Sequence, residues 1–492
     1  MAAPVFDNAL VDTLFPAPSF FGSFASPMSS KLYPGITPES TNTLRRLLVE
    51  NHKRFHVFFD PAGRVFHNHL SHHLFAAYGI GAPPHVLQNA FDSHASYQRP
   101  SFKSPKPITH NTWMEHLGDG NYYNAYMSFF ASEIKRHGVA VTFEKYVLSH
   151  DANWASGQPR MLDRFFSGLV HPMIHFGHAA EFGIDGMAVE GLAQTAVHET
   201  LFDNVFDANF FIQPKSTSDP GPLMVFESTP NKTSTDRVHS FTILSRMLED
   251  DRLKPGVAYE KGANIRSEEV SKNVGMILRE YASLWTINKD EKDIQERIEE
   301  INWFVTLLFG VGGWKKDKSF SANFFLVHYV TSNIFLSSIL SLLSPKHKVD
   351  LMRAYFATSL VWFVAQGRPA LDVQGFFQST SVDPKPSPGP ELVATKEPEG
   401  NPWYTILSHS IHHPDEHQIK AARALAHGAA LYGTRPKGHF AHTELRGAEA
   451  IDGTLFVRTG GLLMDALKWE YEVKEQVGGV DDRIGWDYTE LD

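Results

Sequence analysis

Long stretches with the periodicity of an α-helix run through most of this chain. In each stretch apolar residues recur three and four positions apart, and several stretches end in Gly or run into Pro, as helices do. Alternating stretches flanked by turns, which are typical of β-strands, are hard to find. The helical stretches cover residues 41–55, 66–80, 121–138, 187–203, 268–286, 322–343 and 347–366. The sequence therefore predicts an all-α fold.

The domain organisation follows from the segments that lack this periodicity. Residues 1–40 are rich in Pro, Ser and Phe, and we expect an extended arm there, with residues 41–492 forming one large helical domain. Residues 380–402 are rich in Pro and charged residues, which predicts a loop. The helix after that loop is apolar nearly all round and is expected to be buried, so we interpret the loop as an excursion from a single domain.

The apolar stretch 324–343 is long enough to span a membrane. It also contains His328, an Asn, a Thr and several Ser, so a helix buried in a large core is the better interpretation. The amino terminus lacks the pattern of a signal peptide, and the carboxyl end matches no peroxisomal or retention signal. We expect a cytoplasmic protein without a membrane partner.

The composition narrows the possible chemistry. The 492 residues include no Cys, which excludes disulfides, thiolate catalysis and iron–sulfur clusters, so any bound metal must use nitrogen and oxygen ligands. The formal net charge is −10 and runs of Lys and Arg are absent, so a nucleic-acid partner is not expected.

Histidines gather on the helix predicted after Pro414. Because Pro suits the first position of a helix, His413 is expected at or beside the N-cap, and Gly433 is expected to close the helix. His417 and Lys420 lie three residues apart on a face of small apolar residues. That face is expected to be buried.

Three other segments place histidines in similar surroundings. The stretch 171–178 repeats the pattern of 413–420, His-Pro-x-x-His-x-x-(His or Lys). A third predicted helix carries histidines among which helical phase puts His73 on the apolar side, and a fourth carries His328 within twenty otherwise uncharged residues. The histidines of these segments are His69, His72, His73, His171, His175, His178 and His328.

Two interpretations of these histidines compete. Each histidine taken alone is most simply a core residue bonded to a carbonyl, and Lys420 a lysine whose stem packs while its amine reaches water. Convergence of several helices on one cation would satisfy several buried imidazoles at once, which favours a metal site for iron, copper, nickel or zinc. The expected ligands are His73, His175, His328, His417 and Lys420, with His69, His72, His171 and His413 as weaker candidates.

Lys420 is the unusual member of this set. Burial should push it toward the neutral amine, which can take up carbon dioxide to form a carbamate, an anionic oxygen ligand. Lys420 is therefore our candidate catalytic residue. Glu181, Glu190 and Glu199 are the alternative sources of an anionic ligand.

Five segments, which include the histidine patterns above, carry a further signal: residues 68–84, 168–199, 324–336, 413–425 and 483–487. Together they resemble the questin oxidase-like family of mostly fungal enzymes. The resemblance implies insertion of oxygen beside a ring carbonyl of an anthraquinone, in Baeyer–Villiger fashion or by dioxygenation, and opening to a benzophenone-type acid in a polyketide pathway. It also implies a non-haem Fe(II) centre held by histidines and a carboxylated lysine, which by position would be Lys420.

Motifs of other enzyme classes are missing. No G-x-G-x-x-G follows a strand, since "GVGGW" at 310–314 has the wrong spacing, and neither G-x-S-x-G nor H-E-x-x-H occurs. Our hypothesis is that four histidines, one from each helix, and carboxylated Lys420 hold Fe(II) for reaction of dioxygen with a small aromatic polyketide. An oxygenase that takes electrons from external NADPH and a non-catalytic helical binding protein with structural histidines are the alternatives.

Overall fold

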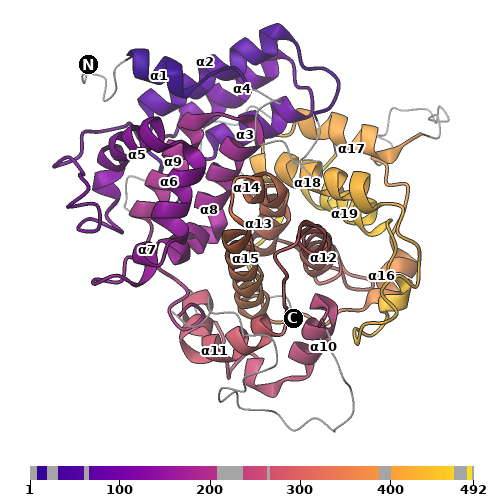
Figure 1. The fold of residues 1–492 in the computed structure, drawn as a ribbon. Helices are drawn as coiled ribbons and strands as arrows, with labels where there is room; N and C mark the ends of the chain where they lie inside the picture. The colour runs from indigo at the N-terminus through magenta and orange to yellow at the C-terminus, as the bar shows by residue number, and fades with distance from the viewer. Residues whose placement is uncertain are drawn as a thin grey trace.

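The computed structural model describes residues 8–18, 32–59, 66–207, 237–262, 266–386, 400–469 and 485–489. These residues form a single all-α domain, which confirms the fold class expected from the sequence (Figure 1). The one sheet among them consists of two residues on each side, Ala322–Asn323 (β1) and Trp486–Asp487 (β2), paired in parallel.

The helices of the amino-terminal half are α1 (Asn8–Leu14), α2 (Pro38–Arg54), α3 (Leu70–Gly79), α4 (Pro84–Ala95), α5 (Tyr123–His137), α6 (Val139–Phe143), α7 (Asp151–Trp154), α8 (Met161–Phe182) and α9 (Asp185–Val197). Those of the carboxyl-terminal half are α10 (Ser240–Glu249), α11 (Arg266–Ser283), α12 (Glu291–Gly310), α13 (Phe324–Asn333), α14 (Leu336–Ser341), α15 (Pro345–Ala365), α16 (Val373–Ser379), α17 (Pro402–Ile411), α18 (Glu416–Tyr432) and α19 (Leu455–Leu467). Short helical turns of other types cover Gly120–Tyr122, Glu144–Leu148, Asp251–Leu253 and Ala448–Ala450.

Four helices from distant parts of the sequence meet near the centre of the molecule. Helix α13 packs against both α8 and α18, and α3 also contacts both of them (Figure 1). Every residue of α3 is buried, as are most residues of α8 and α18. A helix that is covered all round carries even its polar side chains into the interior. This packing explains why so many histidines of the chain lie out of contact with water.

The apolar stretch 324–343 is divided between α13 and α14, and its residues are mainly buried in the core. This confirms its interpretation as core. None of the helices in the described ranges is long and apolar enough to cross a membrane.

The segments expected to be irregular differ in part from that expectation. Residues 8–14, within the expected extended arm, form α1, and Val11 and Phe15 are fully buried. Most of the expected loop, residues 387–399, lies outside the described residues. Helix α17, which follows it, is only partly buried, with Tyr404 73% exposed, because its polar face turns away from the core.

The helix after Pro414 begins two residues later than predicted. Asp415 is its N-cap and accepts hydrogen bonds from the backbone N–H groups of His417 (2.7 Å) and Gln418 (3.3 Å). The Asp415 carboxylate accepts hydrogen bonds from the free backbone N–H groups of the first turn, which fixes the start of the helix at Glu416. His413 therefore lies outside the helix. Gly433 follows the last helical residue, as expected.

Candidate metal centre

Four buried imidazoles form a closed ring between α3, α8, α13 and α18. The ring centroids of neighbouring members are 4.7 Å (His69–His171), 4.9 Å (His171–His328), 5.0 Å (His328–His417) and 4.8 Å (His69–His417) apart. We call these four residues the four-histidine cluster. Each helix contributes one member, as the hypothesis from the sequence required. The structure brings His328 and His417 together with His69 and His171, which had been the weaker candidates.

Each member of the four-histidine cluster turns its Nδ1 atom toward an oxygen outside it. His69 Nδ1 lies 2.5 Å from Glu416 Oε1, and His328 Nδ1 lies 2.7 Å from the carbonyl of Phe324. His171 Nδ1 lies 2.5 Å from the carbonyl of Gly168. His417 Nδ1 lies 3.3 Å from carboxylate oxygens of both Asp415 and Glu416. When a neutral imidazole donates its N–H from Nδ1, its Nε2 atom carries no proton and offers a lone pair.

The Nε2 atoms of the cluster lack the hydrogen bonds that buried nitrogens need. Those of His328 and His417 have no hydrogen-bond partner, and those of His69 and His171 face each other at 2.5 Å. Burial is the main reason that the pKa values of His69, His171 and His328 lie well below the usual value, so these side chains are neutral. Four converging lone pairs would repel each other and lack compensation, whereas a cation would bind them all. The residues present therefore fit a metal ion.

Lys420 follows His417 by one turn of α18 on the same side of the helix. It is buried, and its Nζ atom has no hydrogen-bond partner. Burial lowers the pKa of Lys420 to about 8, although Glu416 and Asp415 act in the opposite direction. This is the direction expected from the sequence. The ammonium form still predominates at pH 7, and the neutral amine becomes the main form only above about pH 8.

An irregular backbone places His171. Within α8, residues 168–170 adopt left-handed conformations, with φ values of 55°, 54° and 57°. Such values are costly for Leu169 and Val170, which have a Cβ atom. The turn directs the Gly168 carbonyl at His171 and lets Pro172 stand in the first turn of a new right-handed segment, where its missing N–H costs little.

Two acidic residues of this site were missed as ligand-orienting groups. Neither Glu416 nor Asp415 is among the site residues predicted from the sequence, yet both lie against the Nδ1 atoms of cluster histidines. Asp415 Oδ2 also accepts a hydrogen bond from the indole of Trp486 (2.6 Å), which ties the site to the carboxyl-terminal strand. Carboxylates that hold the far nitrogen of a ligating histidine are a general feature of metal sites, so the acidic pair beside His417 was the available signal.

The other candidate histidines are held by different partners. His73 Nδ1 lies 3.1 Å from His94 Nε2, and His413 Nε2 lies 3.1 Å from the carbonyl of Leu467. His175 lies 2.7 Å from Glu190 and 3.0 Å from His72. The structure thus does not place these side chains in the four-histidine cluster.

The three glutamates considered as anionic ligands are also held elsewhere. Glu181 forms a buried ion pair with Arg423, and Glu190 accepts hydrogen bonds from two histidines. Glu199 is exposed. Within the described residues, carboxylated Lys420 remains the candidate for an oxygen ligand. The Glu416 carboxylate lies against the Nδ1 atoms of His69 and His417, on the outer side of the cluster.

A sequence model of the questin oxidase-like family matches residues 66–425, a range that includes the whole four-histidine cluster and Lys420. The chain belongs to the questin oxidase-like family.

Individual members of this family match over most of their length. The chain is 27% identical over 409 residues to a Baeyer-Villiger oxidase of Pestalotiopsis microspora, covering 80% of this chain and 82% of that protein. It is 24% identical over 406 residues to the questin oxidase of Aspergillus terreus, covering 80% and 81%. It is 25% identical over 392 residues to an oxidoreductase of Aspergillus parasiticus, covering 77% and 71%. The protein is therefore an oxidoreductase, and the alternative of a non-catalytic binding protein does not hold.

Aromatic side chains lie beside His417 of the cluster. The ring of Phe324 lies 4.9 Å from His417 and 4.6 Å from Tyr488, measured between centroids. Trp486 lies 5.9 Å from His417. Phe324 and Tyr488 are only partly buried. A flat aromatic molecule could stack at such a surface.

Proposed function

We propose that this protein is a non-haem iron oxygenase that cleaves a ring of an anthraquinone-type polyketide to give a benzophenone-type product. The observation that carries the proposal is the convergence of four buried imidazoles that all present Nε2 inward and anchor Nδ1 outward. Nitrogen ligands without thiolate suit iron in the +2 state. The similarity to a questin oxidase and to Baeyer-Villiger oxidases supports oxygen insertion into a quinone substrate.

His69, His171, His328, His417 and Lys420 would hold the metal, and bound Fe(II) would supply the activation of dioxygen. Glu416 would keep the imidazoles of His69 and His417 oriented. The Gly168 and Phe324 carbonyls would do the same for His171 and His328. The buried surroundings would keep bulk water away from the reacting groups.

Carboxylation of Lys420 would complete this ligand set. The neutral Nζ would attack the carbon of carbon dioxide, a C–N bond would form, and the amine would lose one proton to give a carbamate anion. One anionic oxygen ligand would partly balance the charge of Fe(II). The unpartnered Nζ inside the protein supports this modification, because a buried amine without a hydrogen bond is costly.

The substrate is proposed from the relatives and from the aromatic side chains beside the cluster. Phe324 and Trp486 lie against the ring of His417, and Tyr488 lies against Phe324, so three aromatic rings gather at this member of the cluster. A planar tricyclic quinone could stack there with a carbonyl directed toward the cluster. Ring opening of the quinone to the acid with dioxygen as co-substrate would also consume two electrons and two protons, which the hydroquinone form of the substrate or an external reductant would supply.

The metal content of the purified protein tests this proposal. Protein reconstituted anaerobically with Fe(II) should retain about one iron per chain by elemental mass spectrometry. Lys420→Met, which keeps an unbranched apolar side chain, should lose that iron. The control is Lys348→Met. Lys348 lies on α15 and pairs with Glu291 of α12, so this variant should keep the iron. An iron-free wild type, or full activity of Lys420→Met, would contradict the proposal.

The source of electrons is tested with the same preparation. In a single turnover the Fe(II) protein reacts with oxygen and an anthraquinone supplied either as the quinone or pre-reduced to the hydroquinone, each with and without NADPH. Both forms are needed because conversion of the quinone to a benzophenone-type acid with one O2 consumes two electrons and two protons. Product formed from the hydroquinone without NADPH supports iron-dependent cleavage. Product formed only with NADPH would support an NADPH-dependent Baeyer–Villiger monooxygenase on the same class of substrate.

A further inference from the structure

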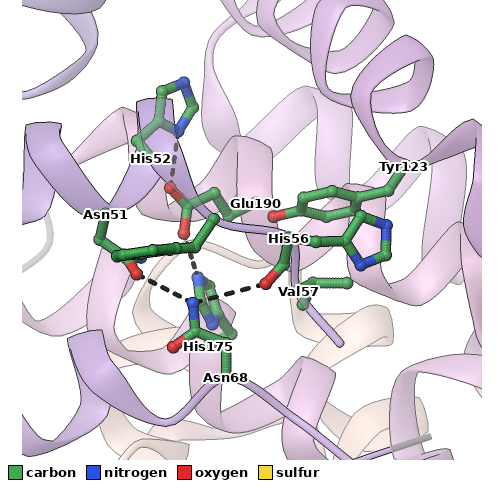
Figure 2. Close-up of a pocket in the computed structure, with 9 residues that line it drawn as sticks. Asn51, His52, His56, Val57, Asn68, Tyr123, His175 and Glu190 are labelled. Atoms are coloured by element: carbon green, nitrogen blue, oxygen red, sulfur yellow. Dashed lines mark hydrogen bonds and ion pairs between the residues drawn. The ribbon is translucent and has the colours of Figure 1, made fainter. Parts of the chain in front are cut away.

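A chain of hydrogen bonds leads from α2 through α9 and α8 to α3, beside the four-histidine cluster. Glu190 Oε1 lies 2.6 Å from His52 Nδ1, and Glu190 Oε2 lies 2.7 Å from His175 Nε2 (Figure 2). His175 Nδ1 in turn lies 3.0 Å from His72 Nε2. All four side chains are buried, and His72 is not exposed at all. We call this chain the Glu190 relay.

The direction of these hydrogen bonds follows from the carboxylate. Burial alone would raise the pKa of Glu190, but the hydrogen bonds from His175 and His52 lower it to about 2, so the side chain is ionised and only accepts. His52 Nδ1 and His175 Nε2 must then donate. An imidazole that carries one proton and donates it from Nε2 accepts at Nδ1, so with one proton on His175 the hydrogen bond runs from His72 Nε2 to His175 Nδ1.

This direction leaves His72 with an unprotonated Nδ1. That atom has no hydrogen-bond partner, although it is buried. The ring of His72 lies 5.7 Å from that of His69, 5.3 Å from that of His178 and 6.3 Å from that of His171, measured between centroids. His72 thus differs from the cluster histidines, which anchor Nδ1 and present Nε2.

The outer end of the relay opens on a small polar cavity. His52, Glu190 and His175 line it together with Asn51, Asn68 and Tyr123 (Figure 2). The space open to the centre of a water molecule is about 10 Å³, about one such molecule and far too little for a tricyclic quinone. This cavity is therefore not the substrate site, and the relay lies between it and the cluster.

We propose that Glu190 and His175 are positioning residues that fix the tautomer of His72, so that its Nδ1 accepts a hydrogen bond from an N–H or O–H group held at the four-histidine cluster. The tautomer follows from the hydrogen-bond directions with one proton on each imidazole, whereas the value of this acceptor for catalysis rests on the proposed function. Two donors fit the chemistry: the side-chain nitrogen of Lys420 and a water or hydroxyl group. Lys420 lies on α18, which packs against α3, the helix that carries His72.

Nitrogen NMR of the metal-free protein with ¹⁵N-labelled histidine tests the tautomer directly. The signals of His72 are assigned by their loss in His72→Asn. Nδ1 should have the shift of a pyridine-type nitrogen and Nε2 that of a pyrrole-type nitrogen. Glu190→Gln should change this pattern, because an amide offers only one acceptor to two histidines. A protonated Nδ1 in the wild type, or an unchanged pattern in Glu190→Gln, would overturn the proposal.

Glu133→Gln is the matched control for this experiment. Glu133 is also a buried carboxylate, on a helix that packs against α9, but it is bonded to Tyr146 and Lys145. Its variant should leave the His72 signals unchanged. In Lys420→Met, a shift of the Nδ1 signal identifies the lysine nitrogen as the donor, and an unmoved signal identifies a water or hydroxyl group.

Two variants of His72 test the acceptor in the iron-loaded enzyme. The Oδ1 of Asn occupies the position of Nδ1 relative to the backbone, whereas the polar atoms of Gln occupy that of Nε2. His72→Asn should therefore keep most of kcat, and His72→Gln should lose about 10–100-fold in kcat, both with unchanged iron content and KM. Equal kcat values would overturn the acceptor role. If the protein binds no iron, the proposed function fails, and the NMR result still decides the tautomer.

Discussion

The four-histidine cluster and the Glu190 relay contain the same residue type in neighbouring helices, yet they are built differently. Three cluster members stand at the start of a helical segment: His69 is the N-cap of α3, His171 follows the left-handed turn of α8, and His417 is the second residue of α18. In the relay, His175 and Glu190 lie inside regular helix. The cluster thus depends on local backbone, and the relay depends on helix packing.

The difference in hydrogen bonding is what separates a candidate metal site from a structural network. In the relay, His52 Nδ1, both nitrogens of His175 and His72 Nε2 each face a partner within hydrogen-bond distance. In the cluster the inner nitrogens face each other without donors. A buried group of histidines therefore indicates a metal only where the second nitrogen of each ring is already occupied.

The strongest test of this comparison exchanges one histidine in each region for the same residue. His171→Gln removes a cluster member and should weaken iron binding by more than about 100-fold, beyond what loss of a surrounding hydrogen bond costs. His175→Gln removes a relay member and should retain about one iron per chain. Iron titration of the two variants, followed by elemental analysis, measures the contrast. Loss of iron in His175→Gln with retention in His171→Gln would reverse the assignment of the two regions.

The backbone of the cluster can be broken without touching a histidine. A Cβ atom on Gly168 would lie 2.3 Å from the ring of His198, and its φ is +55°. Gly168→Ala should therefore cost about 3 kcal/mol of unfolding free energy, from left-handed strain and overpacking together. It should also weaken iron binding, since the Gly168 carbonyl orients His171.

Gly157→Ala is the control for that substitution. Gly157 also has a positive φ, of +91°, but its Cβ would meet no atom within 4 Å. Denaturant unfolding should show only the backbone cost, about 1 kcal/mol, with iron binding unchanged. Equal effects of the two variants would mean that the packing of His198 against the turn contributes nothing to the cluster.

The same contrast explains what the sequence could and could not predict. The helices, the buried stretch 324–343 and the contribution of one histidine from each of four helices all followed from apolar periodicity, which reports burial. His328 and His417 were found because each lies on the buried side of its helix. Periodicity is a strong signal where the backbone is regular.

The remaining cluster members lie where periodicity does not apply. His73 was favoured over His69 by helical phase, but His69 is the N-cap and has non-helical φ and ψ angles. Nothing in the sequence ranked His171 against His175, because the left-handed turn at 168–170 includes Leu169 and Val170, which normally avoid it. The roles of Glu416 and Glu190 depend on partners far away in the sequence, His69 and His52, and such pairings are set by tertiary packing.

The smallest expected effect is a loss of folding stability in acid that comes from His73, which pairs with His94 outside the four-histidine cluster. Burial is the main reason that the pKa of His73 falls to about 3, with a further decrease from His94. Below pH 6.5 the unfolded chain binds a proton that folded His73 refuses, so stability falls as the pH drops from 6.5 toward 3. At pH 5 this one residue should account for about 2 kcal/mol of lost stability, at about 1.4 kcal/mol per pH unit.

Chemical denaturation of metal-free protein at pH 7 and pH 5 measures this loss of unfolding free energy. In His73→Leu the loss should be smaller by this amount. His85→Leu, at an exposed position, should leave the loss unchanged. If His73→Leu also leaves it unchanged, His73 is protonated in the folded protein, and its pairing with His94 requires a different arrangement of protons.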